Sequence, residues 1–241
     1  MKKKIILALL LAAFIAGGAF AQMMEMSVGG GLLFDFSGNN GLKIETTNPP
    51  APFGDGKSRS DYTGFRNTSF GAFAFFDVTY AEIDTYFAYG LMSIVGETKE
   101  GTASAKKSNP VDAGGALQFG FSMLGKYPVD LGGVTIFPLV GFDYNIVLSA
   151  DSKLRGNGKA MDFSQFGFLA GVGTDIKMSG PLFLRLEGLL HMRFPPKIFK
   201  DTKTAVDLTS VLYEAFGGKF SAKTTWGFGP QIKAAVGFKI K

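Results

Sequence analysis

The chain has 241 residues, of which 19% are charged and none is cysteine. The charged fraction is below the roughly 25% that is usual for soluble domains, and the lack of cysteine excludes disulfide bonds, thiolate metal sites and a cysteine nucleophile. The net charge of +5 falls to +2 when the three lysines at positions 2–4 are set aside, which is too small to indicate nucleic-acid binding.

Residues 1–21 have the pattern of a secretory signal peptide. Lys2, Lys3 and Lys4 precede an apolar run at 5–15, and Ala19-Phe20-Ala21 supplies the small residues of a cleavage site. The alternative is a transmembrane anchor, which needs roughly 20 apolar residues, and neither this run nor any later stretch reaches that length. We therefore predict export, cleavage after Ala21 and one mature domain over 22–241.

In chain order, the mature sequence contains eight segments in which apolar and polar residues alternate. In the first, Val28, Leu32 and Phe34 share one face while Ser27 and Asp35 share the other. Period two predicts β-strands whose two faces meet different surroundings. The segments have about 10 to 15 residues each, longer than the average soluble strand and enough for the ~9–11 residues of a tilted membrane strand. The segments cover 25–36, 70–80, 81–91, 117–126, 134–146, 165–177, 182–194 and 226–240.

The connections between these segments alternate in length. Long polar stretches cover 37–67, 96–113, 149–163 and 195–223, and the last of them has a helical pattern over 207–216. Short connections lie near Tyr80-Ala81, 127–133 and 178–181. Long loops on one side and tight turns on the other are typical of outer-membrane barrels, and closure satisfies every strand N–H and C=O in lipid. We predict an all-β fold, an eight-stranded antiparallel up-and-down transmembrane β-barrel with four long extracellular loops.

The sequence offers little basis for catalysis or for a cofactor. His191 is the one histidine, with Glu187 four residues before it, but no serine is placed beside it and its strand position points it into the barrel. One histidine without cysteine also gives no metal-ligand set. The glycine run at 29–31 lies within a strand with no helix after it, so it is not a phosphate loop. We expect no enzyme activity, no cofactor and no metal.

The face predicted to point inward carries many charges near the short turns. Charges buried together in a narrow barrel must pair, so we predict an ion-pair network formed by Asp175, Arg185, Glu187, Lys177, Lys239, Lys126, Glu25, Asp77 and Asp84. A short turn at 178–181 would place Asp175 opposite Arg185, with Lys177, Glu187 and Lys239 near enough to join. The alternative is the charged constriction of a small pore, below an interior made partly apolar by Leu33, Phe73, Phe75, Phe137, Leu139 and Leu169.

The chain resembles the small eight-stranded outer-membrane barrels, the class of the OmpX/Ail, OmpA transmembrane and OmpW families. The likeness covers 22–241 and rests on this architecture. The first strand, with Gly-Leu-Leu-Phe-Asp-Phe at 31–36, and the Phe-Phe-Asp-Val-Thr-Tyr segment at 75–80 also resemble surface barrels of spirochaetes. The last strand, 233–240, is similar to the signal read by the outer-membrane assembly machinery, although Ala235 stands where glycine is usual and Lys241 follows the terminal apolar residue.

The resemblance implies residence in the cell outer membrane, with membrane lipid and the assembly machinery as partners. Three functions are open: a surface barrel whose loops mediate adhesion, bind a host or extracellular ligand or support envelope structure; an OmpW-like narrow channel for small hydrophobic molecules; and, least favoured, a lipid-modifying envelope enzyme. Loops carry function in rigid scaffolds, which favours the first. Trp226, Tyr144 and Phe194 are expected near the outer interface, and Tyr80 and Tyr127 near the periplasmic one.

Overall fold

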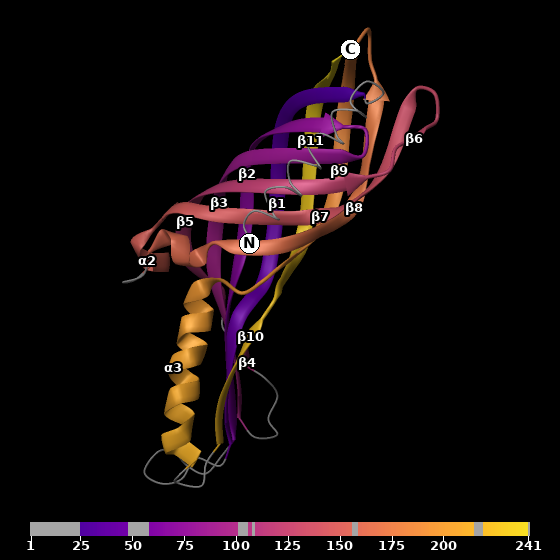
Figure 1. The fold of residues 1–241 in the computed structure, drawn as a ribbon. Helices are drawn as coiled ribbons and strands as arrows, with labels where there is room; N and C mark the ends of the chain where they lie inside the picture. The colour runs from indigo at the N-terminus through magenta and orange to yellow at the C-terminus, as the bar shows by residue number, and fades with distance from the viewer. Residues whose placement is uncertain are drawn as a thin grey trace, which may run out of the picture.

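A computed structural model describes residues 25–47, 58–100, 106–107, 109–155, 159–214 and 219–240, so the predicted leader at 1–21 lies outside the described part. Eight long antiparallel strands form a closed ring (Figure 1). They are β1 (Met26–Thr47), β2 (Arg59–Val78), β3 (Ala81–Glu100), β5 (Val111–Lys126), β7 (Val134–Ala150), β8 (Gln165–Lys177), β9 (Leu182–Arg193) and β11 (Gly227–Ile240). Each pairs with the next along the chain, and β11 pairs with β1 to close the barrel.

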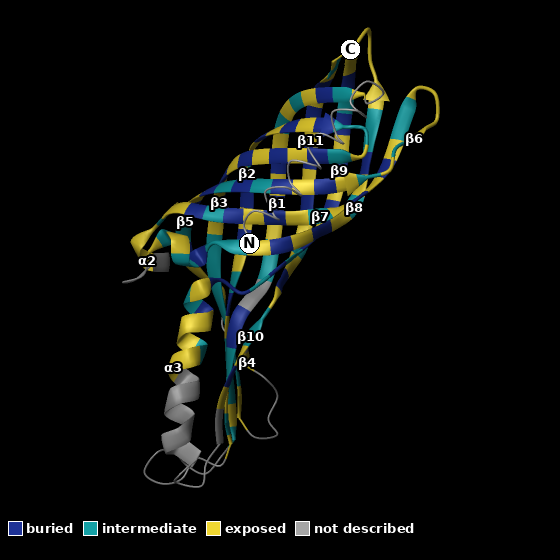
Figure 2. Ribbon diagram, viewed as in Figure 1, coloured by how far each residue is buried: buried dark blue, intermediate teal, exposed yellow. Residues whose placement is uncertain are grey.

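Burial alternates residue by residue along these strands, as their period-two pattern requires (Figure 2). Large apolar side chains point outward, and Val140 and Leu190 are 66% and 67% exposed. Charged side chains point inward, and Arg185, Glu82 and Asp84 are 0% exposed. This distribution is the reverse of a water-soluble domain, in which charged residues are almost never fully buried.

The short connections differ slightly from the predicted ones. The turn between β2 and β3 consists of Thr79 and Tyr80, one residue earlier than expected. The stretch 127–133 contains a short strand, β6 (Val129–Asp130), which pairs with the start of β7. Met178–Pro181 forms the tight turn between β8 and β9, and Gly180 takes a positive φ of 67° there.

In the predicted long loops at 37–67 and 96–113, the residues that the structure describes are largely strand, which corrects the sequence prediction. Residues 41–47 of β1 pair with 59–64 of β2 and with β10 (Lys219–Thr225), while the end of β3 pairs with β4 (Lys106–Lys107). We call these paired strand ends the extension sheet. It projects beyond the barrel, away from the short turns (Figure 1). Backbone pairing and tertiary packing override its polar, loop-like composition.

A bulge in β1 turns the extension sheet relative to the barrel wall. The register with β2 shifts between Ser37 and Asn40. Before the bulge the odd-numbered Leu33 and Asp35 are buried, whereas after it the even-numbered Leu42 is buried. One extra residue in a strand exchanges its two faces, so the apolar side chains beyond the bulge turn toward the helix that covers them.

Three helical segments lie at this end of the molecule: α2 (Ser152–Arg155), the 3-10 helix η2 (Ala160–Phe163) and α3 (Lys197–Glu214). The helix predicted over 207–216 is the second half of α3, although 215 and 216 fall outside the described residues. The helix begins earlier than predicted, at Lys197. In this first part, Phe199 stacks on Phe65 at 5.2 Å and packs near Leu42. Within the described residues, no helix is both long and apolar enough to span a bilayer.

Candidate functional site

The short-turn end of the lumen holds a group of eight charged side chains, which we call the turn-side cluster. Its members come from six strands and comprise Asp77, Glu82, Asp84, Lys126, Asp175, Arg185, Glu187 and Lys233. Most are buried, because the interior of an eight-stranded barrel is just wide enough for side chains to fill it.

Arg185 of β9 is the centre of the turn-side cluster. Its guanidinium donates to Asp175 on the neighbouring strand β8 through Nε at 2.7 Å and Nη2 at 2.6 Å. It also crosses the lumen and donates to Glu82 on β3 at 2.5 Å and to Asp77 on β2 at 2.6 Å. The group further lies 4.3 Å from the ring centre of Phe75, so one side chain fills much of the cross-section.

Asp175 and Arg185 face each other directly, in the register that the short turn predicts. Lys126 donates to Asp77, and Lys233 of β11 donates to Asp84 on β3. The Nζ of Lys233 also lies 3.3 Å from the Glu187 carboxylate. The predicted residues Asp175, Arg185, Glu187, Lys126, Asp77 and Asp84 are therefore brought together.

Lys177, Lys239 and Glu25 do not join this cluster, which corrects the prediction. Lys177 binds Asp130 at 3.0 Å, and Lys239 binds Glu25 at 2.7 Å, around a cavity of ≈ 290 Å³ at the barrel mouth. The two lysine side chains are 41% and 39% exposed. Both lysines lie near the ends of their strands at the rim, where water reaches their ammonium groups. The hydrogen bond from Lys177 lowers the pKa of Asp130.

A second ion-paired group, which the sequence pattern did not predict, lies farther from the short turns. We call Asp35, Asp143, His191, Arg193 and Gln231 the loop-side cluster. Arg193 donates to Asp35 at 2.8 Å and to Asp143 at 2.9 and 3.0 Å, and Gln231 donates to Asp35 at 3.0 Å. The Nδ1 of His191 lies 3.4 Å from Asp35. All five residues are buried.

A glycine provides the signal that would have revealed this group. Arg193 faces Gly167 on β8, and Gly167 faces Asp143 on β7. Because the intervening residue has no side chain, the arginine reaches over β8 to the second strand. In the sequence, two opposite charges on either side of one inward-facing glycine would therefore have predicted the pairing of Arg193 with Asp143. Charges on directly adjacent strands alone do not predict it.

Replacing Gly167 with alanine is expected to weaken the loop-side cluster. A Cβ at this position would lie 2.7 Å from Asp143 Oδ1 and 2.8 Å from Arg193 Cγ, so the ion pair must shift. We expect a loss of about 1–3 kcal/mol in the free energy of unfolding, as for other overpacked sites. Urea titration of the barrel folded in detergent measures it. Gly133→Ala is the control, since nothing lies within 4 Å of a Cβ there; equal losses in both variants would contradict the mechanism.

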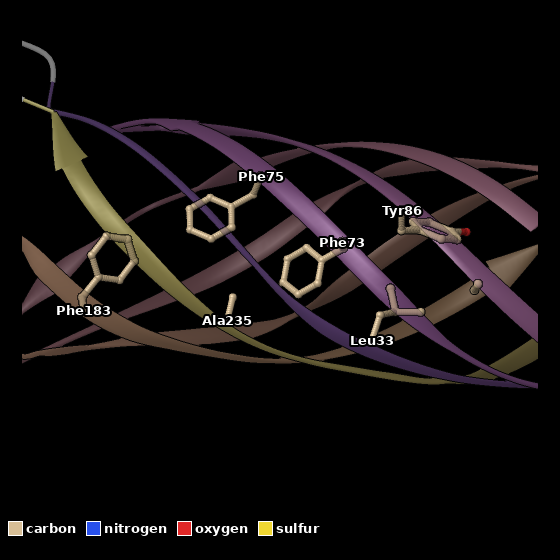
Figure 3. Close-up of a cluster of buried hydrophobic side chains, with 7 residues drawn as sticks. Leu33, Phe73, Phe75, Tyr86, Phe183 and Ala235 are labelled. Carbon is tan, nitrogen blue, oxygen red and sulfur yellow. The ribbon is translucent and has the colours of Figure 1, made fainter.

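Apolar and amide side chains fill the space around the two clusters. Figure 3 shows Phe73, Phe75 and Phe183 turned into the barrel with Leu33 and Tyr86, and all are buried. On the loop side Asn145 donates to Gln118 at 2.8 Å, and Phe163 of η2 packs over this end against Phe65 at 5.8 Å. The apolar interior expected from Leu33, Phe137, Leu139 and Leu169 is present, but these side chains pack on their neighbours and are at most 2% exposed.

The chemistry of the lumen follows from this packing. Charged groups hold opposite walls of the barrel together, and their burial keeps bulk water away from them. His191 is 1% exposed, so its imidazole is shielded from bulk water. Among the described residues, Glu82, Asp84 and Glu187 are suited to a metal ion, since one carboxylate oxygen from each lies within 4.8 Å of the others.

Comparison with known proteins gives a structural likeness but no family. No protein-family model matches the chain, and no curated protein matches it. Among solved structures, it is similar to the crystal structure of the outer membrane protein OprG from Pseudomonas aeruginosa, with 11% sequence identity and a TM-score of 0.41 over 90% of this chain and 95% of that one. The class of this chain, a closed antiparallel β-barrel with an apolar outer face and an ion-paired lumen, rests on its own strand pairing and burial.

Proposed function

We propose that the chain is a non-catalytic surface barrel of the outer membrane, with a closed lumen and a binding or envelope-supporting role carried by the part that projects from the barrel. The expected signal peptide supports export. The expected assembly signal at 233–240 supports insertion by the outer-membrane assembly machinery. The same proposal makes membrane lipid the partner of the outer face.

The outer face supports the membrane location. In the described strands, the exposed positions between the two aromatic zones carry many large apolar side chains among small or uncharged ones, and no charge. Tyr80 stacks on Tyr127 at 6.3 Å near the short turns, and Phe194 contacts Trp226 at 4.9 Å near the opposite end. Two aromatic zones that flank an apolar band match the two interfaces of a bilayer.

The buried charges of the lumen are the observation that carries the functional proposal. An open aqueous pore would expose Arg185, Lys233 and Arg193, yet they are 0%, 1% and 0% exposed. This closure disfavours the channel hypothesis and leaves the outside of the molecule to carry function. The extension sheet and α3 project farthest from the barrel (Figure 1), so we assign to them the contact with a host or extracellular ligand.

Two measurements test the proposed function. In planar bilayers, the wild-type barrel is expected to give no steady conductance, because both charged clusters block the lumen. An epitope inserted between Lys106 and Lys107 is expected to bind antibody on intact cells. Steady conductance would instead favour a channel, and antibody binding only after permeabilisation would place the extension sheet in the periplasm.

A further inference from the structure

The turn-side cluster contains two more acids than bases. Five carboxylates, from Asp77, Glu82, Asp84, Asp175 and Glu187, face three cations, from Lys126, Arg185 and Lys233. Glu82 and Asp84 are 0% exposed and Glu187 is 3% exposed. Surplus negative charge in such a dry environment costs free energy unless a further positive charge is bound.

The available cations are already used on other oxygens. Arg185 donates to the Oε2 of Glu82, and Lys233 donates to the Oδ2 of Asp84. The second oxygens, Glu82 Oε1 and Asp84 Oδ1, are buried and receive no hydrogen bond. Neither oxygen of Glu187 receives one, although the Lys233 ammonium lies 3.3 Å away. The buried Glu187 carboxylate therefore lies beside the carboxylates of Glu82 and Asp84, whose second oxygens also lack a donor.

We propose that Glu82, Asp84 and Glu187 bind a hard divalent cation of the size of Ca²⁺ inside the lumen. One oxygen from each residue lies within 4.8 Å of the other two. With Ca²⁺–oxygen bonds of about 2.3–2.6 Å, two ligands of one ion lie at most roughly 4.6–5.2 Å apart, so one ion can reach all three oxygens, and the flexible geometry of Ca²⁺ tolerates an irregular site better than the octahedron of Mg²⁺. The ion takes the free oxygens while Arg185 and Lys233 keep theirs, and its two positive charges balance the surplus.

Metal content is the direct test. The mature barrel is unfolded, refolded in detergent with either Ca²⁺ or EDTA, desalted and analysed by elemental mass spectrometry. We expect about one equivalent of Ca²⁺ per chain after refolding with Ca²⁺, and a higher thermal midpoint in that sample than in the EDTA sample, because a ligand of the folded state stabilises it. Wild type without metal, and with equal midpoints in the two samples, would overturn the proposal.

Two variants locate the ion. Glu187→Gln removes a ligand with almost no change in volume, and we expect it to lose both the bound Ca²⁺ and the response of the midpoint to EDTA. Glu25→Gln is the matched control, because Glu25 lies at the rim and pairs with Lys239; it should keep both. If Glu187→Gln retains Ca²⁺, the assigned site is wrong. Should this variant not fold, Glu82→Gln replaces it.

Discussion

Replacing Arg185 with alanine is expected to be among the most destabilising single changes in this barrel. The side chain donates to Asp77, Glu82 and Asp175, and its removal leaves two buried carboxylates and one partly buried carboxylate without their shared cation. Loss of one partner from a buried ion pair costs about 3–5 kcal/mol, and three acids share this one. We expect a fall of at least that size in the free energy of unfolding, measured by urea titration in detergent or lipid vesicles.

Lys239→Ala is the matched control for this change. Lys239 is also an inward-facing cation on a neighbouring strand, but it pairs with Glu25 at the exposed rim. Exposed ion pairs contribute about 0–1 kcal/mol, so this variant should unfold close to wild type. Similar losses in the two variants would show that position in the lumen does not decide the value of a charge. A gain of conductance in Arg185→Ala would show that this side chain also closes the lumen.

Placing arginine on the outer face at Ala170 is expected to have the second large effect. Ala170 is exposed between Val140 and Leu190, two of the most exposed apolar side chains. Arginine at the bilayer midplane costs a transmembrane barrel about 2–4 kcal/mol. Refolding into lipid vesicles with urea titration measures this loss. Ala170→Leu is the control of opposite polarity and should unfold close to wild type.

A variant at the neighbouring Gly171 distinguishes the effect of the inward face from that of the outward face. It points inward, and a Cβ there would lie 2.1 Å from the Gly188 carbonyl oxygen, so Gly171→Ala should destabilise by crowding the wall between β8 and β9. This loss should be the same in detergent and in lipid, whereas the cost at Ala170 should depend on the lipid. Equal losses at the two positions in both environments would contradict the membrane location of the outer face.

Sequence reasoning predicts best where structure follows from period two and short turns. The alternation assigns inward and outward residues along the barrel, and the short turn at 178–181 sets Asp175 opposite Arg185. It does not reveal that Arg185 also contacts Glu82, because strand tilt and stagger decide which residues meet across the lumen. The same limit applies to Lys233 and Asp84, which lie on strands that are not neighbours in the ring.

The extension sheet shows a different limit. The segment 41–47 has the composition of a loop, and it becomes strand because β2 and β10 pair with its backbone and α3 covers Leu42. Of these partners, β10 and α3 lie far away in sequence, and the bulge between Ser37 and Asn40 interrupts the alternation that would have indicated a continuing strand. The prediction for Lys177 and Lys239 is wrong for a simpler reason. The alternation shows that a side chain points inward, but it does not show how deep in the lumen the side chain lies.

The ion pair between Lys233 of β11 and Asp84 of β3, which crosses the lumen, makes the last strand decisive for folding. Asp84 obtains Lys233 from a strand that lies 149 residues later in the chain, and Asp35 obtains Gln231 from 196 residues later. A chain folded as far as β9 therefore holds carboxylates that still need solvent. Ring closure and expulsion of water must occur in one cooperative step, and contacts of such long range are formed slowly. A truncation before β11 should leave an open, hydrated sheet rather than a smaller barrel.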